Sequence, residues 1–180
     1  MEYLAKKLDL DINPGLSDVE KSISRGLRFL VEGDWYWAGK QYRWVILKGE
    51  YLPTIYRLNY PDFVIRYVLL PLKSWEFSKD TYHQGIGRHS PSEVKEMAFK
   101  DIESISIYLG QKEYMFGNVP TEIDCVVFGM VSMVLHCHPK NSIFHLKITN
   151  EHPNLVDFAE RMKQNFWPDW KNCLDKIRTC

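Results

Sequence analysis

The sequence predicts an all-α protein, a bundle of helices packed around one central helix. Three segments open with Ser or Thr followed three residues later by Glu or Asp, the capping box that starts many helices. The third box, Thr121 and Asp124, precedes a run from Ile123 to Leu135 that is apolar almost all round. A helix without a polar face is expected to be buried on every side, so this segment is the predicted centre of the fold.

The composition suits one domain with a sizeable core, because 45% of the 180 residues are hydrophobic and 14% are aromatic. The 23 basic and 23 acidic residues balance, which argues against a nucleic-acid groove. The apolar runs are too short for a transmembrane segment and the first residues do not resemble a secretory signal, so a cytoplasmic location is expected.

The first half of the chain reads as helices separated by loops. Ser17 and Glu20 form a box that opens a long helix, expected to reach about Leu47 with a bend where glycines interrupt it. The elements predicted next are a loop over 48–61, a helix over 62–70 that Pro71 breaks or bends, and a helix over 73–83.

The second half continues this pattern. Ser90 and Glu93 form a further box, and the helix that it opens is expected to end at Gly110. The other predicted elements are a flexible turn over 84–89, a short apolar hook over 114–117, the central helix ending near His138, a loop over 140–153 and a last helix over 154–166. All six residues of the three boxes are predicted to be structural rather than catalytic.

An aromatic-dense segment in the first long helix has two interpretations. The segment contains Trp35, Tyr36, Trp37, Tyr42 and Trp44. Tyr36, Trp37, Gln41 and Trp44 would line an apolar ligand cleft, with Gln41 or Arg43 as a polar contact. The alternative, which we favour, is that these aromatic side chains pack in the core or at an interface.

Histidine and cysteine residues near the end of the central helix raise the question of a metal site. The donors are His136, Cys137 and His138, with His145 and His152 further along the chain. Adjacent helical residues point in different directions, so we predict no metal site. At Arg88 and His89 the alternatives are an anion-binding turn and a turn that glycines shape, and the completeness of the Ser90–Glu93 box favours the second.

The four cysteines are Cys125, Cys137, Cys173 and Cys180. They show no CxxC spacing and are predicted to be free thiols. We expect Cys125 and Cys137 to be small buried apolar side chains rather than nucleophiles.

The order of these elements resembles the C-terminal helical domain of glutathione transferases, in which a Thr/Ser-x-x-Asp box caps the central helix. Several motifs resemble the failed axon connections and metaxin branch of that superfamily more narrowly. They are Gln84–Ser90, Pro120–Cys125, Phe128-Gly129, Pro153–Leu155, and Arg161 together with Phe166–Trp170. The resemblance implies a glutathione transferase C-terminal-like helical bundle.

The resemblance also implies a division of the chain. Residues 1–15 would be the last helix of a thioredoxin-like domain plus a linker, residues 16–170 the helical domain, and residues 171–180 a tail. In the superfamily the thioredoxin-like half holds glutathione. No catalytic or cofactor-binding residue is therefore expected in this chain, which would use glutathione only if such a domain were supplied.

The function that the resemblance implies is a non-catalytic interaction domain, in a chain that is a fragment, a shortened isoform or a diverged paralogue. Its expected partners are a second copy or a thioredoxin-like or glutathione transferase-like protein. The alternative is one part of a glutathione transferase-like detoxification enzyme whose glutathione-binding half is absent from this chain. By analogy with the metaxins, the alternative location is the mitochondrial outer membrane surface.

Overall fold

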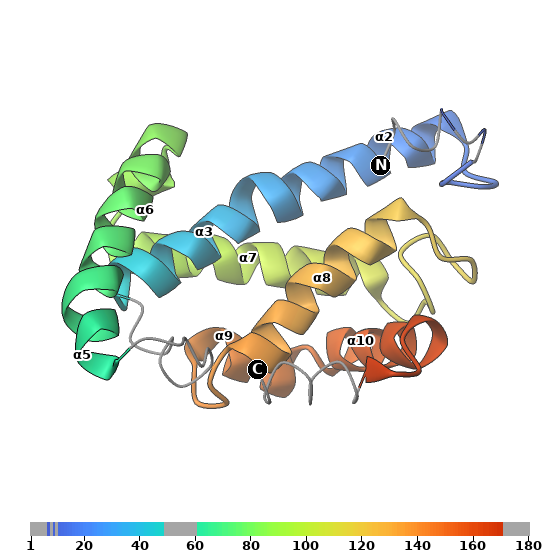
Figure 1. Ribbon diagram of the computed structural model, residues 1–180. Coiled ribbons are helices and arrows are strands. Elements are labelled where there is room, and N and C mark those ends of the chain that lie inside the picture. Colours follow the sequence, from blue (N-terminus) through green and yellow to red (C-terminus); the bar gives the residue numbers. More distant parts are fainter. Residues whose placement is uncertain (1–6, 8, 10, 49–60, 171–180) are drawn as a thin grey trace.

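A computed structural model describes residues 7, 9, 11–48 and 61–170 (Figure 1). Every regular element in these ranges is a helix, and the β contact among them is one isolated bridge between Tyr114 and Gly117. The prediction of an all-α fold is confirmed. The predictions for residues 1–15, the loop over 48–61, Cys173, Cys180 and the tail lie wholly or largely outside the described residues.

One long helix runs along the molecule and is built from α2 (Asp18–Phe29) and α3 (Tyr36–Lys40). Two wider π-helical stretches, Leu30–Trp35 and Gln41–Ile46, lie in the region where the bend is expected, and the bend itself stays a prediction. The remaining helices are α5 (Asp62–Val64), a π-helical stretch Ile65–Leu69, α6 (Leu70–Gln84), α7 (Pro91–Leu109), α8 (Glu122–Cys137), α9 (Ile143–Glu151) and α10 (Pro153–Phe166).

The core lies where α8 packs between α2 and α10, with α7 against both the long helix and α10. In Figure 1, α5 and α6 stand at the left-hand edge of the molecule and α9 and α10 lie beneath α8. The largest fully buried side chains include Trp35, Phe144, Phe158, Ile102, Ile105 and Met115. Trp35 therefore belongs to the core, as one of the two interpretations of the aromatic segment expects.

The prediction that Pro71 breaks or bends the helix after residue 70 is wrong for the break, and the bend stays a prediction. Helix continues from Asp62 through Pro71 to Gln84. A proline lacks an amide donor, and its ring crowds the carbonyl four residues earlier. The crowded carbonyl belongs to Tyr67, which lies in the wider π-helical turn Ile65–Leu69. This turn accommodates the proline ring, so the chain stays helical.

The predicted loop over 140–153 contains helix α9, which the sequence interpretation missed. The Ser142 Oγ accepts a hydrogen bond from the His145 amide at 3.2 Å and caps the helix. Phe144 and Ile148 are buried against the core. The helix has nine residues, with two inward side chains among many polar ones, so its periodicity is weak.

The turn over 84–89, predicted to be flexible, is fixed by hydrogen bonds. The Gln84 Nε2 donates to the Gly33 carbonyl at 2.9 Å, and its Oε1 accepts from the Ile86 amide at the same distance. At Gly87 a Cβ would lie 2.7 Å from the Tyr82 nitrogen, so the close approach of this turn to α6 requires glycine.

The central helix α8 is not buried on every side, which corrects a second prediction. Ile123, Val127, Val131 and Val134 are buried, but one stripe of α8 reaches the surface. Its members are Cys125 and Gly129 near the start and His136 near the end, with Met133 half-buried. Cys125 is exposed and Cys137 half-buried, so the expectation that both are buried is wrong.

The three capping boxes differ in their surroundings. In the exposed first box the Ser17 Oγ accepts from the Glu20 amide at 3.3 Å, and the Glu20 carboxylate accepts from the Ser17 amide at 2.8 Å. Ser90 and Glu93 form the same pair of bonds before α7. These two boxes satisfy helix ends at the surface.

The Thr121 and Asp124 box is fully buried and reaches beyond its own helix. The Asp124 Oδ2 accepts from the Thr121 amide at 2.8 Å and from the Thr121 hydroxyl at 2.9 Å. Its Oδ1 accepts from the Met115 amide in the hook at 2.8 Å. This carboxylate joins the hook to α8. Because Asp124 has no exposed surface, water cannot replace these hydrogen bonds.

We predict that Asp124→Ala lowers the free energy of unfolding by roughly 3–5 kcal/mol, because it leaves buried donors on Thr121 and Met115 without an acceptor. The melting temperature should fall by about 10 °C. Ser17→Ala, in the exposed box, is the matched control and should cost about 1 kcal/mol. Equal losses for the two variants in thermal melts would contradict this assignment.

Candidate functional site

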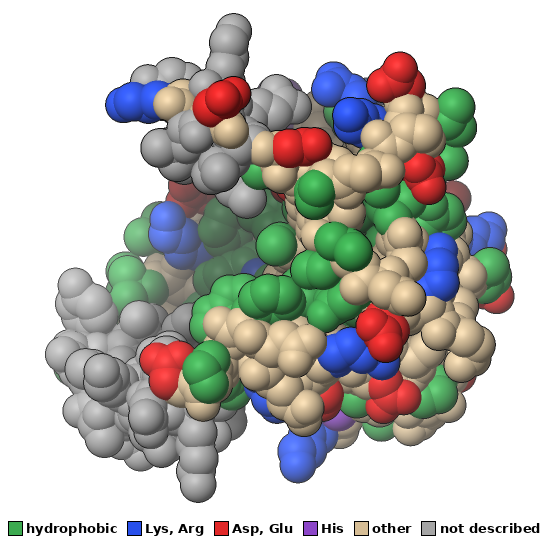
Figure 2. Space-filling model, turned by 90° about the vertical axis from the view of Figure 1, so that its right-hand side faces the viewer, with side chains coloured by type: hydrophobic (Ala, Val, Ile, Leu, Met, Phe, Trp, Pro, Cys, Tyr) green, Lys and Arg blue, Asp and Glu red, His purple; other side chains and the backbone are tan. Residues whose placement is uncertain are grey.

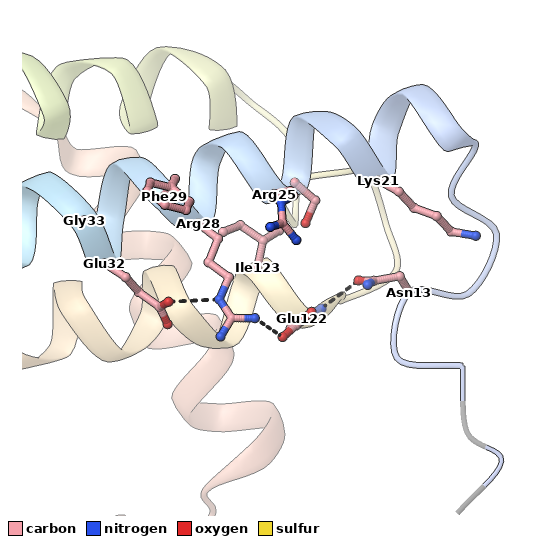
Figure 3. Close-up of a pocket in the computed structure, with 10 residues that line it drawn as sticks. Asn13, Lys21, Arg25, Arg28, Phe29, Glu32, Gly33, Glu122 and Ile123 are labelled. Atoms are coloured by element: carbon pink, nitrogen blue, oxygen red, sulfur yellow. Dashed lines mark hydrogen bonds and ion pairs between the residues drawn. The ribbon is translucent and has the colours of Figure 1, made fainter. Parts of the chain in front are cut away.

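A pocket of about 740 Å³ opens between α2 and the first turn of α8 (Figure 3). Most of its wall comes from one face of α2, and α8 supplies the opposite side. Its lining residues are Asn13, Lys21, Ser24, Arg25, Arg28, Phe29, Glu32, Gly33, Glu122 and Ile123.

Arg28 crosses this pocket from α2 to α8. Its Nη1 lies 2.7 Å from the Glu122 Oε1, and its Nε lies 2.9 Å from the Glu32 Oε2 (Figure 3). The Glu122 side chain is 12% exposed, so this contact is better shielded than an ordinary surface ion pair. The Asn13 Oδ1 accepts from the Glu122 amide at 3.2 Å and extends the network to the segment before α2.

The pocket carries an excess of positive charge. Its lining contains three cations and two carboxylates, and both carboxylates contact Arg28. Lys21 and Arg25 are exposed and have no ion-pair partner among the residues that the structure describes. An acidic surface would therefore find two unpaired cations here.

One apolar side chain of the pocket wall, Phe29, lies one helical turn from Arg25 on α2 and is 71% exposed. Val19 and Ile23 are also exposed, but they lie on another side of α2 and do not line the pocket. Figure 2 views the molecule from the side on which α2 begins and shows hydrophobic side chains exposed there among charged ones. A surface that combines apolar area with unpaired charge is typical of protein contacts.

The four residues of the predicted apolar cleft lie elsewhere, and none of them lines this pocket. Gln41 is buried and accepts a hydrogen bond from the Thr81 hydroxyl at 2.6 Å. The Trp44 ring lies 4.7 Å from that of Phe77 on α6. These two contacts hold α6 against the long helix.

The other two cleft residues are nearer to solvent. The Tyr36 and Trp37 rings meet edge to face at 5.7 Å, and Tyr36 is 42% exposed. An apolar ligand at these residues stays a prediction.

No group of three or more possible metal ligands exists among the residues that the structure describes. His138 is buried, and burial together with the nearby Arg43 lowers its pKa to about 4. Burial also lowers the pKa values of His136 and His145. These histidines are neutral near pH 7, and the structure brings them near one another without assembling a ligand set.

Arg88 and His89 make contacts with neighbouring residues. The Arg88 Nε donates to the Tyr82 carbonyl at 3.2 Å, and its guanidinium lies over the Tyr82 ring at 5.0 Å. The His89 Nδ1 lies 4.0 Å from the Glu93 carboxylate. These contacts agree with a turn rather than an anion site.

The pocket residues were not singled out from the sequence, although a signal was present. Lys21, Arg25, Arg28 and Glu32 follow the three- and four-residue spacing of one helix face. Such a charged stripe usually faces solvent. The contact that distinguishes it is Arg28 with Glu122, 94 residues away, which the spacing does not reveal.

One buried carboxyl group lies outside this site. Asp101 on α7 is 8% exposed, and its Oδ2 has no hydrogen-bond partner within the described part of the chain. Burial, with a smaller contribution from the nearby Asp34, raises its pKa from 3.8 to about 7. The folded protein therefore holds a proton on Asp101 that the unfolded chain releases at much lower pH.

Comparison with known proteins supports the relationship suggested by the motifs. Residues 98–162 match the glutathione S-transferase, C-terminal domain family. The chain is 28% identical to failed axon connections of Drosophila melanogaster over 98% of its length, and 27% identical to metaxin-2 of Homo sapiens over 88%. It is also 25% identical to isoprene-epoxide glutathione S-transferase of Rhodococcus over 92%.

The alignments cover only part of each relative's own length. The aligned region covers 45% of failed axon connections and 60% of human metaxin-2, so the chain spans about half the length of these relatives. A fourth relative, from Arabidopsis thaliana, is named a mitochondrial outer membrane import complex protein and is 28% identical over 68% of the chain. No solved structure matches significantly. Among the described residues, none of the helices is long and apolar enough to cross a bilayer.

We predict that Asp101→Asn stabilises the protein at about pH 8 by roughly 2–4 kcal/mol, because the variant avoids ionising a buried carboxyl group. The folded pKa lies above the unfolded pKa, so the stability contributed by the bound proton is lost as the pH rises from 3.8 through about 7. The difference between variant and parent should shrink toward about pH 4 in denaturant titrations. A difference that does not vary with pH would contradict the assignment.

Proposed function

We propose that the chain is a non-catalytic interaction domain. Its similarity to failed axon connections and metaxin-2, and the match of residues 98–162 to the glutathione S-transferase, C-terminal domain family, support this proposal. Its docking face is the surface that α2 and the start of α8 form together. The observation that carries this proposal is the pocket between these helices, with its exposed apolar and cationic wall.

The chemistry of this face favours a protein partner. Phe29 presents an apolar side chain to solvent next to Arg25 on α2, and its burial against an apolar side chain of a partner would favour a complex. Lys21 and Arg25 would meet acidic residues, which favours one orientation of the partner over others.

The Arg28 network gives this face a fixed shape before a partner arrives. Arg28 is held by carboxylates from two helices, and Asn13 adds a hydrogen bond to the same corner. Side chains that are already held lose less conformational freedom on binding. The Arg28 network therefore supports the docking face, while Lys21 and Arg25 are the cations that can pair with acidic residues of the partner.

The partner that we propose is a thioredoxin-like or glutathione transferase-like protein, with self-association as the alternative. A thioredoxin-like partner would supply the half that holds glutathione in the superfamily. On this proposal the chain binds glutathione only through such a partner.

A second candidate function is one part of a glutathione transferase-like enzyme. Similarity to a bacterial isoprene-epoxide glutathione S-transferase over most of the chain favours it. Glutathione conjugation by the chain combined with a thioredoxin-like half would support the enzyme, and binding of that half without conjugation would support the interaction domain.

For location, we propose the cytoplasm, with the mitochondrial outer membrane surface as the alternative that the name of the Arabidopsis relative suggests. Recovery of the protein with purified mitochondria, and its release by protease added outside them, would favour the alternative.

We predict that Phe29→Asp and Arg25→Glu each weaken association at least roughly tenfold, because they place a carboxylate where apolar and cationic groups meet the partner. The measurement is sedimentation velocity of the chain alone, and then with the portion of failed axon connections that lies outside the aligned region. Both side chains are exposed, so folding should be preserved.

Ile107→Asp is the matched control, since Ile107 is 72% exposed on α7 and does not line the pocket. The control should associate like the parent. A parent chain that remains monomeric and leaves that portion unbound would contradict the proposal.

A further inference from the structure

A second exposed apolar surface lies on α6, and it shares no lining residue with the pocket of α2 and α8. The helix stands at the edge of the molecule, with the rest of the fold on one side of it (Figure 1). Trp75 is 62% exposed, Leu72 58% and Tyr82 56%. The inward side is secured by Thr81, whose hydroxyl bonds Gln41, and by Phe77 against Trp44.

The exposed residues have the spacing of a helix-pairing seam. Leu72, Trp75, Lys79 and Tyr82 alternate steps of three and four residues, which is the a and d pattern of a heptad repeat. Val68 and Tyr67, 47% and 79% exposed, continue the apolar surface toward α5. A stripe with this period stays in contact with a second helix that crosses at a small angle.

Lys79 is the charged member of this seam and identifies the chemistry of the partner. Its Nζ lies 3.5 Å from the centroid of the Trp75 ring, and it has no carboxylate partner among the described residues. The nearby carboxylates are already engaged, Glu76 with Lys73 and Asp80 with Lys40. A helix packed on the seam would remove Lys79 from water, so it must supply an acceptor to offset the lost hydration.

We propose that the outer face of α6 binds an amphipathic helix of a partner protein, with apolar residues at heptad spacing and a carboxylate opposite Lys79. Trp75 is the central anchor of this surface, and Leu72 and Tyr82 flank it. The lysine sets the register, because a charged residue at one a position disfavours every alignment that leaves it unpaired.

A second copy of the chain fits this face poorly. A parallel pair would place Lys79 against Lys79 of the copy, and an antiparallel pair would place it beside Trp75 of the copy. Neither arrangement gives the lysine a carboxylate. A lipid surface is a separate outcome of the test below, because Glu76 and Asp80 lie on one side of the seam and are already paired with Lys73 and Lys40.

The test uses two designed peptides as probes, each of about 21 residues with Leu at the a and d positions of three heptads. One carries Glu at the central a position and the other carries Lys. Binding of labelled peptide to the full chain is followed by fluorescence anisotropy. The Glu peptide should bind with a dissociation constant of order 10 µM, roughly tenfold more tightly than the Lys peptide.

Variants of the chain distinguish recognition of the peptide's charge from non-specific hydrophobic binding. Lys79→Glu should reverse the preference, so that the Lys peptide binds more tightly. Trp75→Ala should weaken both peptides roughly tenfold without lowering the melting temperature, since its side chain is largely exposed. Ile107→Ala, on α7, should leave both affinities unchanged.

Three results would overturn the proposal. They are equal affinity of the two peptides for the parent chain, a preference that Lys79→Glu leaves unaltered, and absence of saturable binding by both peptides. Binding to vesicles of phosphatidylcholine and phosphatidylserine that Trp75→Ala abolishes, without peptide binding, would assign the face to lipid instead. Loss of self-association in Trp75→Ala, again without peptide binding, would assign it to a second copy.

Discussion

The carboxylate of Asp124 is the contact on which the rest of this fold depends. It caps α8 through Thr121 and binds the amide of Met115, so one buried group fixes both the start of the central helix and the hook before it. The hook is in turn tied to α10, because the Asn165 Nδ2 donates to the Tyr114 hydroxyl and Arg161 donates to the Glu113 carbonyl. A displacement of Asp124 would therefore disturb the start of α8, the hook, and the contact of the hook with α10.

The same corner positions the candidate docking face. Glu122, two residues before Asp124, is the residue of α8 that holds Arg28 across the pocket. The position of the first turn of α8 thus sets its distance from the pocket-lining face of α2. The outer face of α6 depends on other contacts, Gln41 with Thr81 and Trp44 with Phe77, so the two proposed surfaces are built independently. A fold whose exposed apolar side chains lie on separate helices suits a protein that binds more than one partner.

Local patterns predicted most of this fold, and contacts between distant residues explain what they missed. The capping residues and the periodicity of α2, α7 and α10 are short-range signals, and the helices they open are present. Whether α8 was buried all round depended on its neighbours, and the small residues Cys125 and Gly129 face solvent instead. The continuity of helix through Pro71 depended on a local π-helical turn, and the pocket on a contact 94 residues apart. Spacing alone determines none of these.

The most direct test of this account is hydrogen exchange at the Met115 amide, measured by NMR in the native protein. Met115 is fully buried and its amide donates to Asp124. If this bond joins the hook to the core, the amide should exchange as slowly as those in the middle of α8, such as Val131, because both open only when the core unfolds. Exchange of the Met115 amide at the rate of an exposed loop, while Val131 stays protected, would contradict the central place given to Asp124.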